Sequence, residues 1–92
     1  SEGFCNAVLE AQALGKLCVV SDAEGLSENV LHNKTGWVVQ KLNPEALAQK
    51  IQDVILLPKT DKDKITANAR QRVKDEFNLE KQKRMFNAFY SK

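Results

Sequence analysis

The chain has 92 residues, of which 42% are hydrophobic and 28% charged, and its formal net charge is +2. This length corresponds to one small domain or to part of a larger one, and the composition is ordinary for a globular protein. The sequence has neither an apolar run near 18 residues nor a signal-peptide pattern, which excludes a membrane-spanning helix. Because it does not begin with Met, we expect it to start inside a longer protein.

Charge is distributed unevenly along the chain. Residues 1–58 carry four basic and seven acidic side chains, a balance of −3, and residues 59–92 carry ten basic and five acidic ones, a balance of +5. A basic segment can associate with anionic lipid headgroups, although a solvated helical face explains the same pattern. The basic residues alternate with acidic ones and lack a motif of stacking aromatic residues, so nucleic acid is not expected as a partner.

The first elements predicted in chain order are a helix and a strand. A helix over about residues 4–14 ends at Gly15, a residue that suits the left-handed turn after a helix. Its core-facing stripe consists of Phe4, Ala7, Val8, Ala11 and Leu14. The apolar, β-branched run 17–20 is typical of a strand buried on both faces of a parallel sheet.

A helical turn over residues 27–31, with Ser27 as N-cap, precedes a second strand over 36–39 in which Trp37 is expected in the core. Asn43 then caps a helix with Pro44 at its first position, and Leu42 and Leu47 form a hydrophobic staple.

The remaining sequence predicts helices with clear apolar stripes. The helix after Asn43 ends before Pro58, and its stripe is Leu47, Ile51, Val54 and Ile55. The next helix, from about Thr60, buries Ile65, Ala69, Val73 and Phe77. A last helix begins after Asn78, with its inner side formed by Leu79, Gln82, Phe86 and Phe89 or Tyr90.

This alternation predicts an α/β fold with parallel strands. Two strands are expected, whereas a complete Rossmann-like domain has about six. The sheet edges should therefore be covered, either by a missing part of the same domain or by another copy in a homo-oligomer.

Two glutamates eight positions apart, Glu2 and Glu10, form the strongest candidate binding site. Carboxylate oxygens accept charge-assisted hydrogen bonds from sugar and ribose hydroxyls. The residues from Gly3 to Asn6 indicate a loop leading into a helix, whose free N–H groups and positive dipole end suit a phosphate. With helical spacing, Glu2, Asn6 and Glu10 share one face, and the carboxylates lie about 12 Å apart along the axis. This order suits a sugar, a diphosphate and a ribose, although paired surface glutamates also occur without any ligand.

The segments around this pair form an ordered series. They are SEGFCNAVLEA (residues 1–11), ALGKLCVVSD (13–22), GLSENV (25–30), KTGWVV (34–39) and NPEALA (43–48). In order and spacing they resemble the E-x7-E signature, the following strand, the G-x-x-E turn, the T-G-x-x-V strand and the D-P-E-A-L-A helix start of the family-4 (group 1) glycosyltransferases. Residues 77–90 are similar to the last helix of that family. The sequence departs from the commonest pattern at two positions. Glycine or proline is frequent at the position of Cys5, and a second glycine is usual at the position of Glu24.

The resemblance implies a GT-B enzyme of two domains that transfers a sugar from a UDP- or GDP-sugar donor with retention of configuration, without a metal or other cofactor. In that family the residue at the position of Glu2 contacts the donor sugar, so Glu2 is the catalytic candidate. The residue at the position of Glu10 binds the ribose hydroxyls. The other donor-binding candidates, whose backbone approaches the sugar and diphosphate, are Gly3, Phe4, Cys5 and Asn6.

The resemblance also implies a domain organisation. Residues 1–92 correspond to the C-terminal fragment of the donor-binding domain, with an α/β part over 1–58 and C-terminal helices over 59–92. The family's phosphate-binding Arg and Lys would lie upstream. We therefore expect the chain to be inactive alone, and the whole protein to be cytoplasmic, with association at the inner face of the membrane as a further option.

The two cysteines, Glu28 and His32 have side chains that could in principle form other sites. Cys5 and Cys18 fit neither a metal spacing nor a disulfide framework, and we interpret both as free thiols. Glu28 is interpreted as a carboxylate that stabilises its own helical turn rather than one that approaches the donor's base. His32 has no second ligand at a metal-binding spacing and is interpreted as a turn residue. Two alternatives to the enzyme stay open, a non-catalytic nucleotide-sugar-binding module and an assembly module.

Overall fold

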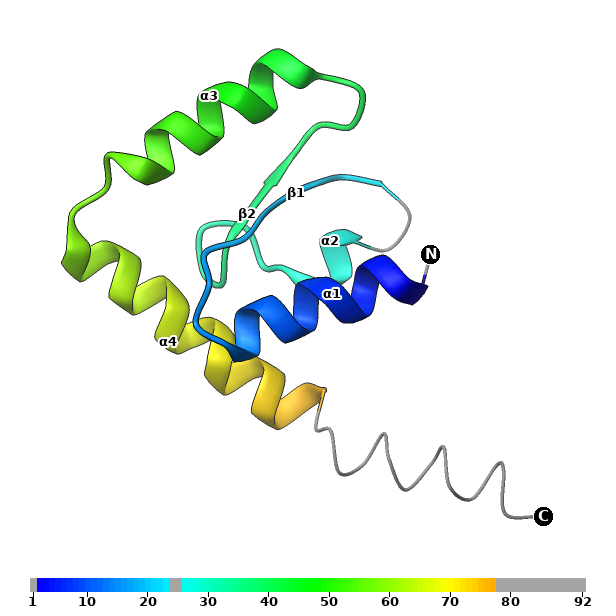
Figure 1. The fold of residues 1–92 in the computed structure, drawn as a ribbon, viewed down its shortest axis with the longest axis vertical. Helices are drawn as coiled ribbons and strands as arrows, with labels where there is room; N and C mark the ends of the chain where they lie inside the picture. Colours follow the sequence, from blue (N-terminus) through cyan, green and yellow to red (C-terminus); the bar gives the residue numbers. More distant parts are fainter. Residues whose placement is uncertain (1, 24–25, 78–92) are drawn as a thin grey trace.

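The computed structural model describes residues 2–23 and 26–77, with side chains described from residue 6 onward except at position 26. The elements run in the order α1 (Glu2–Ala13), β1 (Val19–Ser21), α2 (Leu26–Asn29), β2 (Trp37–Val39), α3 (Pro44–Ile55) and α4 (Lys59–Glu76) (Figure 1). The helix predicted after Asn78 lies outside the described residues. No described helix is both long and apolar enough to cross a membrane.

The two strands form a parallel pair, as predicted. The aligned residues are Val19 and Trp37, Val20 and Val38, and Ser21 and Val39. Backbone bonds extend the pairing beyond the strands, from Trp37 N to the Cys18 carbonyl and from Asp22 N to the Val39 carbonyl. β1 thus begins two residues later than the run 17–20 predicts, because the ladder rather than the apolar run sets the strand's limits.

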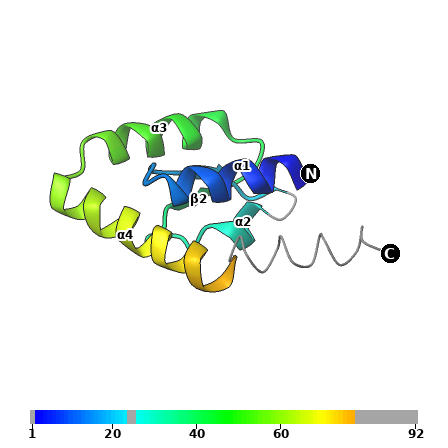
Figure 2. The same cartoon turned by 60° about the horizontal axis from the view of Figure 1, so that its bottom comes forward.

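The strands lie between two helical layers (Figure 2). On one face, α1 contributes to a core of Cys18, Val20 and Val30 with Val8, Ala11 and Val38 packed around it. On the other face, α3 and the beginning of α4 enclose Trp37, Val54 and Ile65 with Leu17, Val19 and Leu57 around them. α4 runs from the α3 side of the sheet to α1, and its buried residues are Ile65, Ala69 and Val73, as predicted. Phe77, expected in the same stripe, follows the last helical residue and is only half-buried.

The end of α1 follows the predicted stop at Gly15. Gly15 has φ +78° and its N–H donates to the Gln12 carbonyl, while Lys16 N donates to the Ala11 carbonyl. This pair of bonds is the Schellman arrangement, which satisfies carbonyls that the helix itself leaves free. Since the chain reverses there, Leu14 is 72% exposed and does not face the core as predicted. Ala7 is exposed as well, and Gln12 occupies the buried position instead.

The beginning of α3 confirms one prediction and contradicts another. The Asn43 side chain accepts a hydrogen bond of 3.0 Å from Ala46 N, and Pro44 occupies the first helical position. The staple is wrong, because Leu42 has φ +57° and is 96% exposed. The left-handed backbone at Leu42 turns its side chain to solvent. Ser27 is likewise inside α2 rather than at its cap.

The apolar stripe of α3 is only partly buried. Val54 is in the core, but Ile51 and Ile55 are 42% and 64% exposed, contrary to the prediction. They lie with Leu17 and Val19 around a hollow of about 380 Å³ between α3 and β1. Two strands offer less apolar surface than the stripe of α3 presents. That another part of the protein or another copy covers this region stays a prediction.

Gly36 lies where β2 approaches β1, and we predict that it tolerates no side chain. A Cβ there would lie 2.6 Å from the Cys18 carbonyl oxygen and 2.8 Å from Val30 Cγ1. Gly36→Ala should therefore lower the free energy of unfolding by about 2–3 kcal/mol. Urea unfolding of the chain, followed by the fluorescence of its one tryptophan, Trp37, measures this.

Gly15→Ala is the matched control. A Cβ at Gly15 has room, with Arg70 3.7 Å away, but its φ is left-handed, which costs an L-residue about 1–2 kcal/mol. An equal or smaller effect at Gly36 would contradict the packing described.

Candidate functional site

All the predicted site residues lie on one helix. α1 begins at Glu2 and contains Gly3, Phe4, Cys5, Asn6 and Glu10. The helical spacing expected for Glu2, Asn6 and Glu10 is confirmed for the backbone. Asn6 and Glu10 are exposed side chains, whereas the side chains of residues 2–5 lie outside the description.

Gly3 to Asn6, predicted as a loop leading into a helix from about residue 4, all lie in α1, so the helix includes Gly3 as well. The first-turn amides of an α-helix have no intrahelical acceptor. Within the described residues α1 starts at Glu2, so Gly3 and Phe4 belong to its first described turn.

A groove lies between the outer face of α1 and the end of α4. Its volume is about 410 Å³, within the usual range for ligand pockets. Its lining consists of Asn6, Leu9, Glu10, Ala13, Leu14, Val73 and Phe77. The carboxylate of Glu10 and the carboxamide of Asn6 are the polar groups on an otherwise apolar wall. This arrangement can hydrogen-bond a diol beside an apolar wall.

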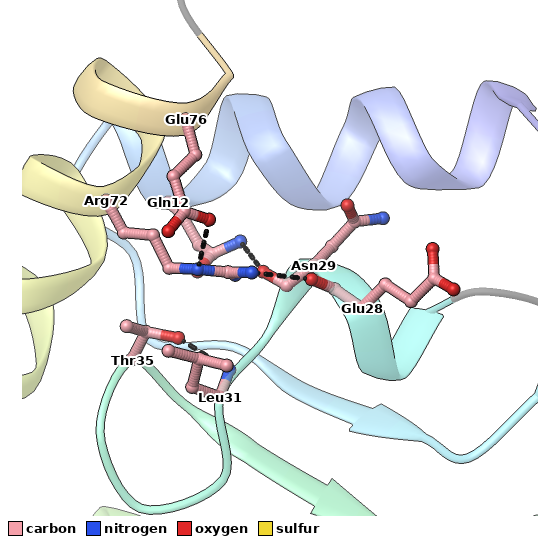
Figure 3. Close-up of polar contacts among 7 residues, drawn as sticks. All are labelled: Gln12, Glu28, Asn29, Leu31, Thr35, Arg72 and Glu76. Atoms are coloured by element: carbon pink, nitrogen blue, oxygen red, sulfur yellow. Dashed lines mark hydrogen bonds and ion pairs between the residues drawn. The ribbon is translucent and has the colours of Figure 1, made fainter.

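The opposite face of α1 is fixed by a buried glutamine (Figure 3). Gln12 is 1% exposed, and its Nε2 donates to the Asn29 carbonyl at 2.9 Å and to the Val8 carbonyl at 3.3 Å. Among the described residues no donor reaches Gln12 Oε1. A buried acceptor without a partner costs about 1–3 kcal/mol.

A second side chain binds the same end of α2. Arg72 of α4 donates from Nη2 to the Glu28 carbonyl at 2.8 Å, next to the Asn29 carbonyl that Gln12 binds (Figure 3). Arg72 Nε lies 3.0 Å from Glu76 Oε2, an ion-pair distance, although the atoms are not aligned for a hydrogen bond. Its guanidinium also lies 5.1 Å from the centre of the Phe77 ring, within cation–π range. Arg72 thus connects α2 to the aromatic wall of the groove.

The sequence did not single out Gln12 or Arg72. Gln12 follows Val8 by four residues and so lies on the same helical face, a signal that could have marked it as a polar residue in a buried stripe. Arg72 gave no such signal, because its acceptor is 44 residues away and belongs to the backbone.

The other weighed residues have local roles. The Glu28 side chain is exposed in the first turn of α2, as the dipole interpretation expects. His32, interpreted as a turn residue, pairs with Gly36 in an isolated β-bridge just before the turn over 33–35, and its Nδ1 accepts a 2.9 Å hydrogen bond from Val38 N. The following turn is held by Thr35, whose Oγ1 accepts from Leu31 N at 2.8 Å. Within residues 2–23 and 26–77, no cluster of three His, Cys, Asp or Glu side chains could hold a metal ion.

The chain was compared with known protein families. The family model of the glycosyl transferases, group 1, matches residues 1–72. The chain belongs to this family. This group 1 chain is 33% identical to the capsular polysaccharide biosynthesis glycosyltransferase CapM of Staphylococcus aureus. The match covers 96% of this chain and 24% of that protein.

Solved structures agree with this family assignment. A glycosyltransferase from Rickettsia africae ESF-5 has a TM-score of 0.75 and 32% identity, covering 89% of this chain and 23% of that one. Sucrose-phosphate synthase from Thermosynechococcus elongatus has a TM-score of 0.76 and 27% identity, covering 92% and 22%. The predicted fold class, part of a Rossmann-like GT-B domain, is thereby confirmed. This group 1 chain spans about a quarter of the length of these relatives.

Cys18 is not placed for nucleophilic chemistry, and we predict that it reacts slowly. It is a free, buried thiol, and burial raises the pKa of Cys18 above its ordinary range. Because the folded state holds the proton more tightly, the free energy of unfolding falls as pH rises through and above the ordinary thiol range. In a Cys5→Ser variant, iodoacetamide at pH 8 should alkylate Cys18 at least about tenfold faster in urea than in buffer. Equal rates would contradict the buried position.

Proposed function

We propose that this chain supplies part of the donor site of a retaining glycosyltransferase, which transfers a sugar from a nucleoside-diphosphate sugar to an acceptor. One observation carries the proposal. α1 begins at Glu2, and one of its faces presents Asn6 and Glu10 to a groove of ligand size. The family assignment supports glycosyl transfer as the reaction of the whole protein.

Glu10 is proposed to bind the ribose of the donor. Its carboxylate is exposed at the groove and can accept hydrogen bonds from two neighbouring hydroxyls. Asn6, one turn closer to the beginning of α1, offers both a donor and an acceptor from its carboxamide. The leucine, alanine and phenylalanine side chains around them would lower the local exposure to water and strengthen these bonds.

The beginning of α1 is proposed to hold the diphosphate and the sugar. The amides of Gly3 and Phe4 and the positive end of the helix dipole suit the negative charge that builds up on a departing diphosphate. Cys5 lies in the same turn and belongs to the proposed binding set by position. Glu2, at the first helical position, would orient the sugar while positive charge develops at its anomeric carbon.

We further propose that residues 1–92 are the C-terminal part of the donor-binding domain, with an α/β part over 1–58 and helices over 59–92. The open hollow beside β1 supports this, since a further strand at that edge would cover it. The chain would then be inactive alone, because it contains no acceptor domain. Phosphate-binding Arg and Lys residues would come from the upstream part.

Glu10→Ala in the complete protein should raise the Michaelis constant for the donor by about tenfold or more and change turnover little. The ribose interaction is the same in the ground state and the transition state, so its loss weakens binding uniformly. Steady-state kinetics with varied donor measures this, with Glu45→Ala of α3 as an exposed control that should behave as wild type. A donor Michaelis constant that stays at the wild-type value would remove Glu10 from the ribose site.

Glu2→Ala should instead lower turnover by about a hundredfold or more, because its interaction with the sugar strengthens as charge develops. Single-turnover measurements at saturating donor separate this step from product release. If the variant binds the donor and turns over normally, Glu2 has no catalytic role. Donor binding without any turnover in the wild-type protein would favour the alternative of a non-catalytic nucleotide-sugar-binding module.

A further inference from the structure

Gln12 is a costly residue for its position. Its side chain is fully enclosed between α1 and α2, with one amide atom bonded to the Asn29 carbonyl and the other without a donor among the described residues (Figure 3). An apolar side chain of the same length would fill the space and remove the unpaired acceptor, but it would leave the Asn29 carbonyl without the Gln12 donor. The gain and the loss are of similar size, so stability alone does not explain a glutamine there.

A hydrogen bond differs from apolar packing in being directional. The apolar neighbours of α1 on this face, Val8 and Ala11, pack against Cys18, Val20 and Val30 but do not by themselves define how far the helix turns or slides. The bond from Gln12 Nε2 to the Asn29 carbonyl has a length of 2.9 Å and ties α1 to one point of α2. That point is itself held, because Arg72 binds the adjacent Glu28 carbonyl from α4.

Glu10 lies two residues before Gln12, about 200° away around the helix. Because α1 turns as one body, a rotation that breaks the Gln12 bond would turn Glu10 through the same angle. The Glu10 carboxylate, on the other side of the helix, would then move across the groove. A slide along the helix axis would shift Glu10 and the first-turn amides of Gly3 and Phe4 together. Displacements near 1 Å are enough to spoil a bidentate contact with a diol.

We propose that Gln12 is a positioning residue of the donor site, which sets the rotation and axial position of α1 and so directs Glu10 toward the ribose. The proposal rests on the proposed function of Glu10. It assigns Gln12 no contact with the donor, so its effect must pass through Glu10.

The test is a double-mutant cycle in the complete protein, with titration of UDP and of GDP by calorimetry. Gln12→Met keeps the length of the side chain and removes its hydrogen bonds. It should weaken binding of the preferred diphosphate about fivefold or more, while the melting temperature changes little, because the unpaired acceptor is gone and the Asn29 carbonyl loses its donor. In a Glu10→Ala background the same substitution should change the affinity less than twofold, since the group that Gln12 positions is absent.

Gln71→Met is the matched control. Gln71 lies on the exposed surface of α4 and donates to Asp75 Oδ1 at 2.9 Å, so Gln71→Met loses a glutamine hydrogen bond of the same length that stays within α4. The affinity of the Gln71→Met variant for the diphosphate should equal that of the wild type. Gln12→Leu provides the same comparison should Gln12→Met fold poorly.

The outcomes separate the two proposals. If Glu10→Ala leaves diphosphate binding unchanged, the proposed ribose site fails and the role of Gln12 fails with it. If Glu10→Ala weakens binding while folded Gln12→Met and Gln12→Leu do not, the positioning role alone is overturned. An equal loss from Gln12→Met with and without Glu10 would also overturn it, because Gln12 would then act by another route.

Discussion

The arrangement of the helices depends on how the carboxyl end of α2 is bound. The last carbonyls of a helix have no partner inside it, and α2 has only four residues. Two of its carbonyls, those of Glu28 and Asn29, accept bonds from Arg72 of α4 and Gln12 of α1. The helices at the two ends of the described chain, α1 and α4, are thereby both bonded to α2, the short helix that follows β1. The Gln12 bond is buried and satisfies the Asn29 carbonyl, whereas the Arg72 bond to the Glu28 carbonyl lies at the surface.

This arrangement gives α1 two faces with different tasks. Its inner face packs on the sheet through Val8, Ala11 and Gln12, and its outer face carries Asn6 and Glu10. The groove beside Glu10 is completed by Val73 and Phe77, which α4 brings from more than sixty positions further along the chain. Arg72, next to Val73, lies against the Phe77 ring as well as α2. Residues 72–77, at the end of α4, therefore bind α2 on the inner side of α1 and form one wall of the groove on its outer side.

The small sheet explains both the buried and the exposed apolar residues. Trp37 of β2 and Val54 of α3 are buried because they pack into the same core cluster. Ile51, Ile55 and Leu56 belong to the same helical region and stay exposed, since no described strand extends beneath them. An apolar stripe in a sequence indicates what a helix can bury, but the width of the sheet beneath it decides how much is covered. The confirmed stripe of α4, with Ile65, Ala69 and Val73, differs because the core and α1 cover it.

The sequence by itself determined the features that depend on near neighbours. These are the stop at Gly15, the cap at Asn43 with Pro44, the two parallel strands and the helical spacing of Glu2, Asn6 and Glu10, because turn geometry, capping and periodicity act within a few residues. It placed the beginning of α1 too late, since a weak first turn near Gly3 is read as loop. Only the tertiary structure decided that Gln12 is buried, that Leu14 and Leu42 face solvent and that Arg72 binds α2. Those outcomes depend on carbonyls and surfaces brought together from distant segments, which no local pattern encodes.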